Sequence, residues 1–318
     1  MRHWVFVFVF VLVSYGISGI LYLRERFLQP QELEFLFVGD VMLARGVGEE
    51  MRKRNDFVYP FRRVALALRD AVLMFGNLEG PISSRGANQG SEYSFRADPR
   101  VVRGLKFAGF DVMSLANNHI WDWGAPALFD TIDVLNGAGI RAVGAGRDME
   151  EANAPAVLCV EDGGLKDVEI SRYRNVEISR YRDIEMPRLR DVEYPCSGAR
   201  VAVFAYTNLY PSGLVAGESS PGVSDSRLER VTKDIQAVRG QADLIVVSYH
   251  WGEEYVPEPS REQAGIARAL IDAGADLIIG HHPHVAQRLE KYKNGWIAYS
   301  LGNFVFDQNF SEETMRGE

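Results

Sequence analysis

Six apolar runs of this chain end in the same way, at or just before an Asp, Glu, Asn or His residue. The clearest begins at Leu277 and ends in the sequence Gly-His-His-Pro-His at 280–284. An apolar run without polar alternation is typical of a strand buried on both faces, as parallel strands usually are. The other runs cover residues 34–38, 71–75, 112–116, 244–249 and 296–301. Sites in open α/β sheets lie beyond the carboxyl ends of the strands, so the six endings predict one polar cluster.

Helical patterns separate these runs. The motif Ala-Gly-x-Asp occurs at 108–111 and 273–276, where a glycine ends a helix and turns the chain into the next strand. This alternation predicts an α/β fold with helices on the outside. Helices are expected over residues 59–70, 98–108, 126–136, 226–239 and 260–272, and further strands over 140–143 and 201–206.

Five of the six histidines, all except His3, fall at the strand ends. Neutral imidazole is the commonest metal ligand at physiological pH, and a mixture with carboxylates and amides suits Mn²⁺, Fe or Zn²⁺. Six such ligands are too many for one tetrahedral ion and suit two ions about 4 Å apart that share a bridge. The predicted metal ligands are Asp40, Glu79, Asn118, His250, His282 and His284.

Further residues beside these ligands are candidates for catalysis and substrate binding. His119 could protonate a leaving group, with Asp40 as the second catalytic candidate. Arg45 could bind a substrate anion, and Asn303 is the other predicted substrate-binding residue. Each prediction has an alternative: Asp40 or Asn118 could cap the helix that follows, His119 could be a neutral hydrogen-bonding residue, and Arg45 a solvated one.

The N-terminal region contains nineteen residues without charge, from Val5 to Leu23. A run of this length can cross a bilayer as a helix. The run is long for the apolar core of a signal peptide, so an uncleaved anchor over residues 1–26 is preferred to a cleaved signal peptide or a buried helix. The net charge of −8 argues against a nucleic-acid partner, which would require a basic surface.

Residues 167–190 contain three copies of an eight-residue unit, the first reading Asp-Val-Glu-Ile-Ser-Arg-Tyr-Arg. An even period presents the same face of an extended chain in every copy, so extended structure is favoured over helix. The insert, at about 161–197, is either a surface loop lengthened by duplication or a partner-binding arm. Cys159 and Cys196 flank it, and outside the cell a disulfide across its base would stabilise the fold by about 3–4 kcal/mol.

Six segments in order resemble the CapA family of capsule-synthesis proteins, over about Glu34 to Asp307. They include Phe-Val-Gly-Asp at 37–40, Gly-Asn-Leu-Glu at 76–79, Asn-Asn-His at 117–119, His-Trp-Gly at 250–252, Gly-His-His-Pro-His at 280–284 and Gly-Asn-Phe at 302–304. The family is related to calcineurin-like metallophosphoesterases, so the resemblance implies a four-layer α/β/β/α sandwich over residues 34–318. Met42 and Asn77 stand where those enzymes have a metal-binding His and a bridging Asp.

The resemblance also implies a function. It points to the synthesis, export or anchoring of poly-γ-glutamate, or a similar anionic polymer, by a single-pass membrane protein whose domain is extracellular. The expected partners are the membrane, the capsule polymer and polymer synthase subunits, and the chemistry would be metal-assisted hydrolysis or transfer. Two alternatives remain open: a metal-dependent phosphoesterase acting on an envelope substrate, and a non-catalytic scaffold of a synthase complex.

Overall fold

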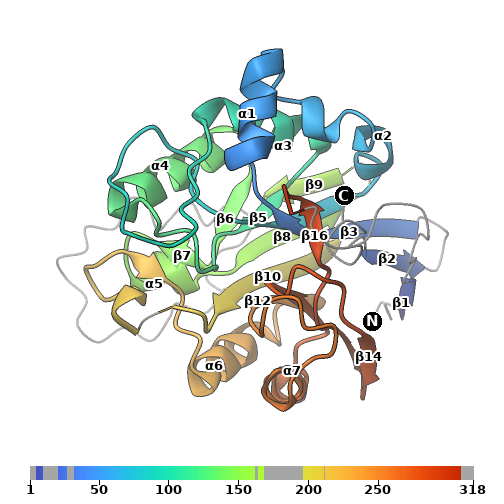
Figure 1. Ribbon diagram of the computed structural model, residues 1–318. Helices are drawn as coiled ribbons and strands as arrows, with labels where there is room; N and C mark the ends of the chain where they lie inside the picture. Colours follow the sequence, from blue (N-terminus) through green and yellow to red (C-terminus); the bar gives the residue numbers. More distant parts are fainter. Residues whose placement is uncertain are drawn as a thin grey trace.

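Two seven-stranded sheets pack face to face in the computed structural model, which describes residues 5–9, 21–26, 32–161, 164–167, 196–210 and 212–308 (Figure 1). In the first sheet β3 to β6 are parallel. On the side of β3 away from β4, β16 lies parallel to the end of β3, while β2 and then β1 continue the sheet as antiparallel strands. Its strands are β1 (Val5–Val9), β2 (Leu21–Arg26), β3 (Glu32–Val41), β4 (Leu73–Leu78), β5 (Val112–Ser114), β6 (Arg141–Val143) and β16 (Asn303–Val305).

The second sheet has a parallel centre and antiparallel edges. Strands β10, β12, β13 and β15 run parallel, while β8, β9 and β14 join as antiparallel neighbours. The order across the sheet is β14 (Leu289–Tyr292), β15 (Gly295–Ala298), β13 (Leu277–His281), β12 (Leu244–His250), β10 (Ala199–Thr207), β8 (Ala156–Glu161) and β9 (Gly164–Asp167). A small separate sheet pairs β7 (Ala145–Gly146) with β11 (Gly222–Val223).

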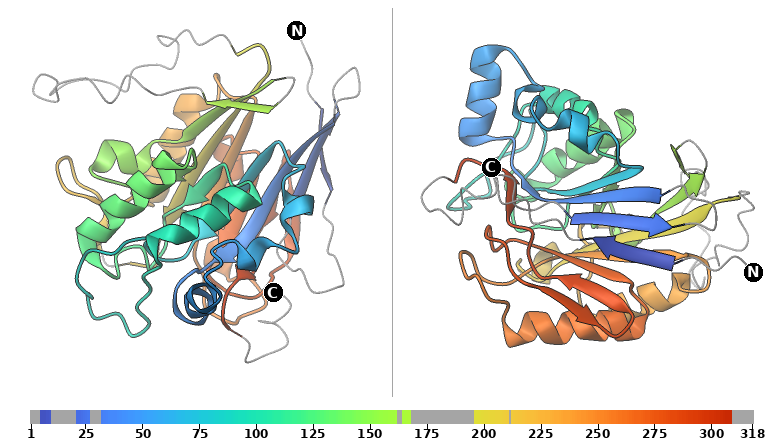
Figure 2. Two further views of the ribbon diagram at one scale, coloured as in Figure 1. Left: turned by 90° about the horizontal axis from the view of Figure 1, so that it is seen from above. Right: turned by 90° about the vertical axis from the view of Figure 1, so that its right-hand side faces the viewer.

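Helices cover the outer face of each sheet, which gives the four layers seen from the side in Figure 2. The first sheet is covered by α1 to α4 and the second by α6 and α7. The helices are α1 (Arg45–Arg54), α2 (Ala65–Leu68), α3 (Val102–Ala108), α4 (Gly124–Gly137), α5 (Met149–Asn153), α6 (Leu228–Val238) and α7 (Arg261–Ala273). Short 3₁₀ turns lie at η1 (Tyr59–Phe61), η2 (Pro99–Val101) and η6 (Ser212–Leu214). The α/β/β/α sandwich predicted from the sequence is therefore the observed architecture.

Three apolar clusters hold these layers together. One lies between the two sheets and includes Phe37 and Phe75 from the first and Val203 and Val246 from the second. The other two lie under the helical layers, where the aliphatic and aromatic faces of the helices meet the outer faces of the sheets. Burial of three such faces is the main driving force for folding, and it fixes where the strands end relative to one another.

Local sequence explains most of the helix boundaries. Asp98 accepts a hydrogen bond from the backbone of Arg100 and caps η2, and Ser260 forms a capping box with Gln263 at the start of α7. Gly109 ends α3 in the left-handed conformation, as the Ala-Gly-x-Asp motif predicted. The helix expected over residues 59–70 is instead divided into η1 and α2.

The predicted N-terminal transmembrane helix is not found. Residues 5–9 and 21–26 are strands, with Val5 opposite Arg26 and Leu21 opposite Phe37, and residues 10–20 lie outside the described part of the chain. Alternating Val and Phe residues favour extended structure as strongly as their hydropathy favours a membrane helix, and here a sheet edge is available to them. Among the described residues, no helix combines the length and the hydropathy needed to cross a bilayer.

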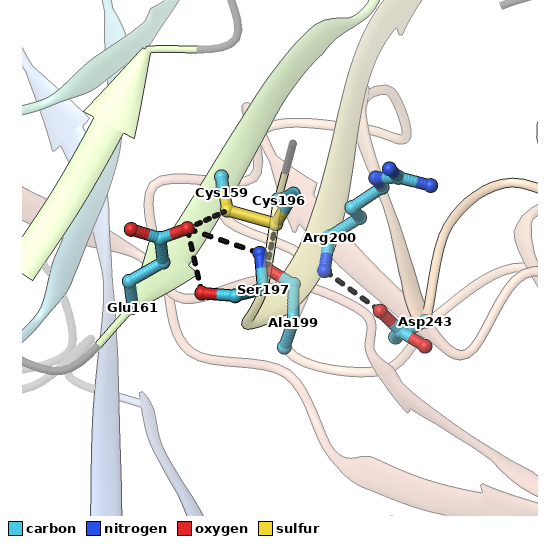
Figure 3. The surroundings of a disulfide bond; sticks show 7 residues. All are labelled: Cys159, Glu161, Cys196, Ser197, Ala199, Arg200 and Asp243. Carbon is cyan, nitrogen blue, oxygen red and sulfur yellow. Dashed lines mark hydrogen bonds between the residues drawn. A yellow bond between two sulfur atoms is a disulfide. The ribbon is translucent and has the colours of Figure 1, made fainter. Parts of the chain in front are cut away.

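The predicted disulfide between Cys159 and Cys196 is present, with the two Cα atoms 5.8 Å apart (Figure 3). It joins β8 to the segment that leads into β10, its antiparallel neighbour. Glu161 accepts hydrogen bonds from the backbone and hydroxyl groups of Ser197 beside it. The eight-residue repeats lie outside the described residues. The disulfide therefore closes the base of the insert and holds the two flanking strands together.

Candidate metal centre

Strand register brings the predicted ligands together from both sheets. In the first sheet Asp40 on β3 lies opposite Asn77 on β4 and opposite Asn303 on β16. In the second sheet His250 on β12 lies opposite His281 on β13. The two rows meet where the strands end, because the backbone N–H of His282 lies 3.2 Å from Asp40 Oδ2. Segments far apart in sequence thus form one buried cluster, as the strand-end pattern predicted.

Asp40 lies at the centre of this cluster and is fully buried. Its Oδ1 accepts a hydrogen bond from Asn77 Nδ2 at 2.8 Å and lies 3.2 Å from His281 Nδ1. Its Oδ2 lies 3.4 Å from His284 Nδ1. Burial alone would raise the pKa of the Asp40 carboxyl, but the adjacent imidazoles of His281 and His284 outweigh burial and hold the pKa well below its usual range.

A second group of donors lies beside Asp40. One donor atom each from Glu79, His250 and His282 lies within 4.8 Å of the other two, and all three residues are buried. Glu79 Oε1 is 4.0 Å from His250 Nε2, which also lies 2.8 Å from Asn118 Oδ1. Glu79 Oε1 and His282 Nδ1 are buried without a hydrogen-bond partner among the described residues. Burying such atoms unpaired is costly, and a divalent cation held by one carboxylate and two imidazoles would satisfy them, so these residues fit a metal ion.

A third donor set shares His282 with the second. It consists of Glu254, His282 and His284, and Glu254 is exposed at the surface. Two of the predicted ligands have different neighbours in the cluster: Asn118 lies beside His250, and His284 lies beside Asp40. The three donor sets together contain five of the six predicted ligands, with the sixth, Asn118, beside His250, and they add Glu254 and His281.

The ionisation of the cluster follows from burial and from the mutual effects of its charges. Burial, followed by the negative charge of Asp40, raises the pKa of Glu79 well above its usual value. Burial, followed by the charge of His282, lowers the pKa of His250, and burial with His284 lowers that of His282 to about 4. Burial also disfavours charge on His284, but Asp40 and Glu79 raise its pKa to about 9. His250 and His282 are therefore neutral near neutral pH, as metal ligands must be.

His119 lies at the edge of the cluster with its ring fixed by two contacts. Its Nδ1 is 2.9 Å from Asp122 Oδ2, and its ring stacks on Phe95 with centroids 4.1 Å apart. Asp122 also accepts hydrogen bonds from the Phe95 backbone and from Ser91. The carboxylate holds the imidazole so that Nε2 is the atom left for a substrate, which is the arrangement a positioned acid or base requires.

Backbone strain collects around the same cluster. Six residues other than glycine have positive φ among those described, and four of them are at the cluster: Arg45, Tyr255, His282 and His284, with φ between 43° and 95°. The other two, Asn55 and Lys293, occupy a helix end and a turn. Strained backbone persists only where surrounding contacts fix it, and it is concentrated at functional sites.

The predicted substrate-binding residues occupy different settings. Arg45 is partly exposed, pairs with Asp307 at 3.2 Å, and places its guanidinium 5.4 Å from the ring centre of Phe95. Asn303 is buried, with its amide oxygen 2.9 Å from His284 Nδ1 and its amide nitrogen donating to Gln308. Arg45 is thus placed to meet a ligand anion, whereas Asn303 orients an imidazole.

Sequence reasoning passed over several residues that the cluster uses. Asn77 was treated only as a departure from a metal-binding pattern, yet its Nδ2 donates to both Asp40 and Glu79. His281 was not predicted as a site residue, because in a strand it should point away from His282. Asp122 stands three residues after His119 in a turn, and that spacing was the available signal.

A four-layer sandwich with imidazoles and carboxylates gathered at its strand ends defines a class: α/β/β/α proteins with a buried cluster of candidate metal ligands where the two sheets meet. The chain belongs to the family of bacterial capsule synthesis proteins called PGA_cap, whose model matches residues 34–308.

Curated relatives agree with this assignment. The chain is 36% identical over 291 residues to the capsule biosynthesis protein CapA of Bacillus anthracis. The aligned region covers 89% of this chain and 62% of that protein. It is 32% identical over 277 residues to the PGA biosynthesis protein CapA of Bacillus subtilis, covering 86% of this chain and 63% of that protein. The chain therefore spans less than two thirds of the length of these relatives. Among solved structures it is similar to the NAD nucleotidase of Haemophilus influenzae, with a TM-score of 0.42 and 12% identity over 90% of this chain and 49% of that one.

Proposed function

We propose that this protein acts in the synthesis, export or anchoring of poly-γ-glutamate, or a similar anionic polymer, through a divalent metal centre. The observation that carries the proposal is the buried cluster of Glu79, His250 and His282, in which Glu79 Oε1 and His282 Nδ1 have no hydrogen-bond partner among the described residues. Family membership and the names of the Bacillus relatives support the polymer as the material on which it acts.

The residues of the cluster have separate tasks in this proposal. Glu79, His250 and His282 would hold the ion, with Asn118 beside His250 and with Asp40 and His284 on the second side. A bound Mn²⁺, Fe or Zn²⁺ ion, alone or as one of two, would supply Lewis acidity and an activated oxygen nucleophile. His119, held by Asp122, would donate a proton to the leaving group, and Arg45 would bind a carboxylate of the polymer.

The location we propose is the outer side of the cell membrane. The disulfide between Cys159 and Cys196 supports an extracytoplasmic compartment, because disulfides persist in oxidising surroundings and are rare in the cytosol. Attachment to the membrane and contact with polymer synthase subunits follow from the sequence resemblance and are part of the same proposal.

Two variants test the proposal together. His282→Ala should lose both bound metal and polymer production, and His119→Gln should lose polymer production while it keeps its metal, because His119 belongs to none of the three donor sets. Metal content is measured on the purified protein by elemental analysis, and polymer yield is measured in cells with matched protein levels.

The outcomes separate three classes of function. Normal polymer yield from His282→Ala would contradict the proposal and indicate a non-catalytic scaffold. Rapid metal-dependent cleavage of a generic phosphodiester by the purified protein, lost in His119→Gln, would instead indicate a phosphoesterase.

A further inference from the structure

Positive charge in this acidic chain is concentrated in one stretch. Residues 45–106 contain twelve Lys and Arg residues and seven Asp and Glu residues, a net charge of +5. The whole chain carries −8, so the remainder carries −13. The net charge of the remainder repels a polyanion at long range, whereas the net charge of this stretch attracts one.

The stretch forms most of one helical layer. It contains α1, η1, α2 and α3, which share an apolar cluster above the first sheet and lie together in Figure 1. The elements are in close contact: the Arg54 guanidinium lies 4.2 Å from the ring centre of Tyr59, and that of Arg100 lies 4.3 Å from Phe57. A Cβ added at Gly104 of α3 would meet the backbone oxygen of Phe57 at 2.4 Å. The elements that carry the basic residues are therefore packed against one another in a single layer.

Three exposed arginines of this layer, Arg52, Arg63 and Arg103, form no side-chain hydrogen bond or ion pair within the described part of the chain. Arg52 is near enough to Asp98 for its charge to lower the pKa of that carboxyl, which Arg100 already neutralises. Other arginines of the layer are neutralised locally, such as Arg62 by Asp56 and Arg100 by Asp98. Unpaired arginines are weakly hydrated and bind carboxylates in a bidentate geometry, so they are the residues that an external anion would engage.

The layer leads directly to the metal centre. Helix α1 starts at Arg45, which lies over Phe95, and Phe95 stacks on His119. The ten residues of α1 extend about 15 Å from that point. A chain bound along α1 would therefore reach the cluster with one end while its other repeats contact the layer.

We propose that this helical layer is the binding surface for the anionic polymer, with Arg52, Arg63 and Arg103 contacting successive carboxylates and Arg45 directing the chain to the metal centre. The identity of the polymer rests on the proposed function, whereas the surface rests on its own charges. An anionic bilayer is a weaker fit, because the exposed apolar and aromatic side chains of this layer are only Leu66, at 81%, and Tyr59, at 41%, among the described residues of its helices, and α2 is too short to present an apolar face.

Binding of fluorescently labelled poly-γ-glutamate to the full chain, followed by anisotropy, tests this surface. Measurements in EDTA remove any contribution of a metal ion. Each of Arg52→Glu, Arg63→Glu and Arg103→Glu should weaken binding about fivefold and reduce its salt dependence. Arg261→Glu is the matched control, since it makes the same change of charge at an exposed residue of α7 on the opposite layer and should leave binding unchanged.

Three results would overturn the inference. Equal losses from Arg261→Glu and the other reversals would indicate a general charge effect, and unchanged binding in all variants would place the polymer elsewhere. Binding to phosphatidylglycerol vesicles but not to the polymer, lost in the three reversals, would assign the surface to a membrane. Loss of metal in His282→Ala with intact polymer binding would still support the binding surface. The proposed metal-dependent function and the proposed binding surface can therefore fail separately.

Discussion

Replacement of Asn77 by Asp offers the sharpest test of the cluster. The Asn77 amide nitrogen donates to Asp40 Oδ1 at 2.8 Å and to Glu79 Oε2 at 2.7 Å, and all three side chains are buried. Asn77→Asp would replace this donor by an acceptor and place a third carboxylate between the other two. Asn77→Ala is the matched control, because it removes the same donor without adding charge.

The expected magnitudes follow from these contacts. Loss of two hydrogen bonds to carboxylates should cost Asn77→Ala about 3–6 kcal/mol of unfolding free energy. The unpaired buried charge in Asn77→Asp should cost about 3 kcal/mol more, or about 5 °C in the midpoint of thermal unfolding. This additional loss should shrink as the pH falls, since the introduced carboxyl would have a raised pKa in the folded state and would gain a proton there first.

The assay is thermal unfolding by circular dichroism, in EDTA and in excess Mn²⁺. Metal should raise the midpoint of Asn77→Asp more than that of Asn77→Ala, because a cation compensates the added carboxylate. The reasoning is refuted if Asn77→Asp in EDTA is as stable as Asn77→Ala, since the carboxylates of Asp40 and Glu79 would then not face residue 77.

Three further predictions concern the ionisation, the cross-link and the packing of the fold. Metal uptake near neutral pH should release one proton for each ion that binds His284, because His284 is protonated below about pH 9 and must lose that proton to bind a cation; calorimetry in two buffers of different ionisation enthalpy measures the release. Cys159→Ser should lower the unfolding free energy by about 3–4 kcal/mol when the disulfide of the unchanged protein is intact. Under reducing conditions the variant and the unchanged protein should be equally stable. Gly39→Ala should destabilise the fold by about 3 kcal/mol or more in urea unfolding, because its Cβ would lie 2.0 Å from the Gly302 oxygen, whereas Gly240→Ala, with open space around it, should not.

The strand-end pattern predicted most of the fold and the outline of the site. Buried parallel strands are apolar throughout, so the first polar residue marks where each one leaves the core, as at Asp40 and His250. The disulfide was predictable because both cysteines flank a single insert. These features depend on local sequence and on the rules of sheet topology, and neither requires the packing of side chains to be known.

The parts that were missed depend on tertiary contacts. Residues 5–9 and 21–26 belong to a run with the composition of a membrane helix, and the edge of β3 is available to them as a pairing partner. The bounds of helix α1 were not predicted, because its few apolar residues, such as Met51, are spread among charged ones. The hydrogen bonds that Asn77 donates to both Asp40 and Glu79 depend on the register of β3 and β4, which the sequence of either strand alone does not specify.

The charges of the cluster explain why an amide at residue 77 suits this protein. With Asp40 and Glu79 both buried, a third carboxylate would leave the metal-free fold with more negative charge than the proton on His284 balances. The neutral Asn77 donates to both acids and keeps the metal-free cluster nearly balanced. A metal ion at the proposed site would have one carboxylate fewer to bind, and the buried donor set that remains for it is Glu79, His250 and His282. We therefore expect Asn77 to make the stability of the fold less dependent on a bound metal ion.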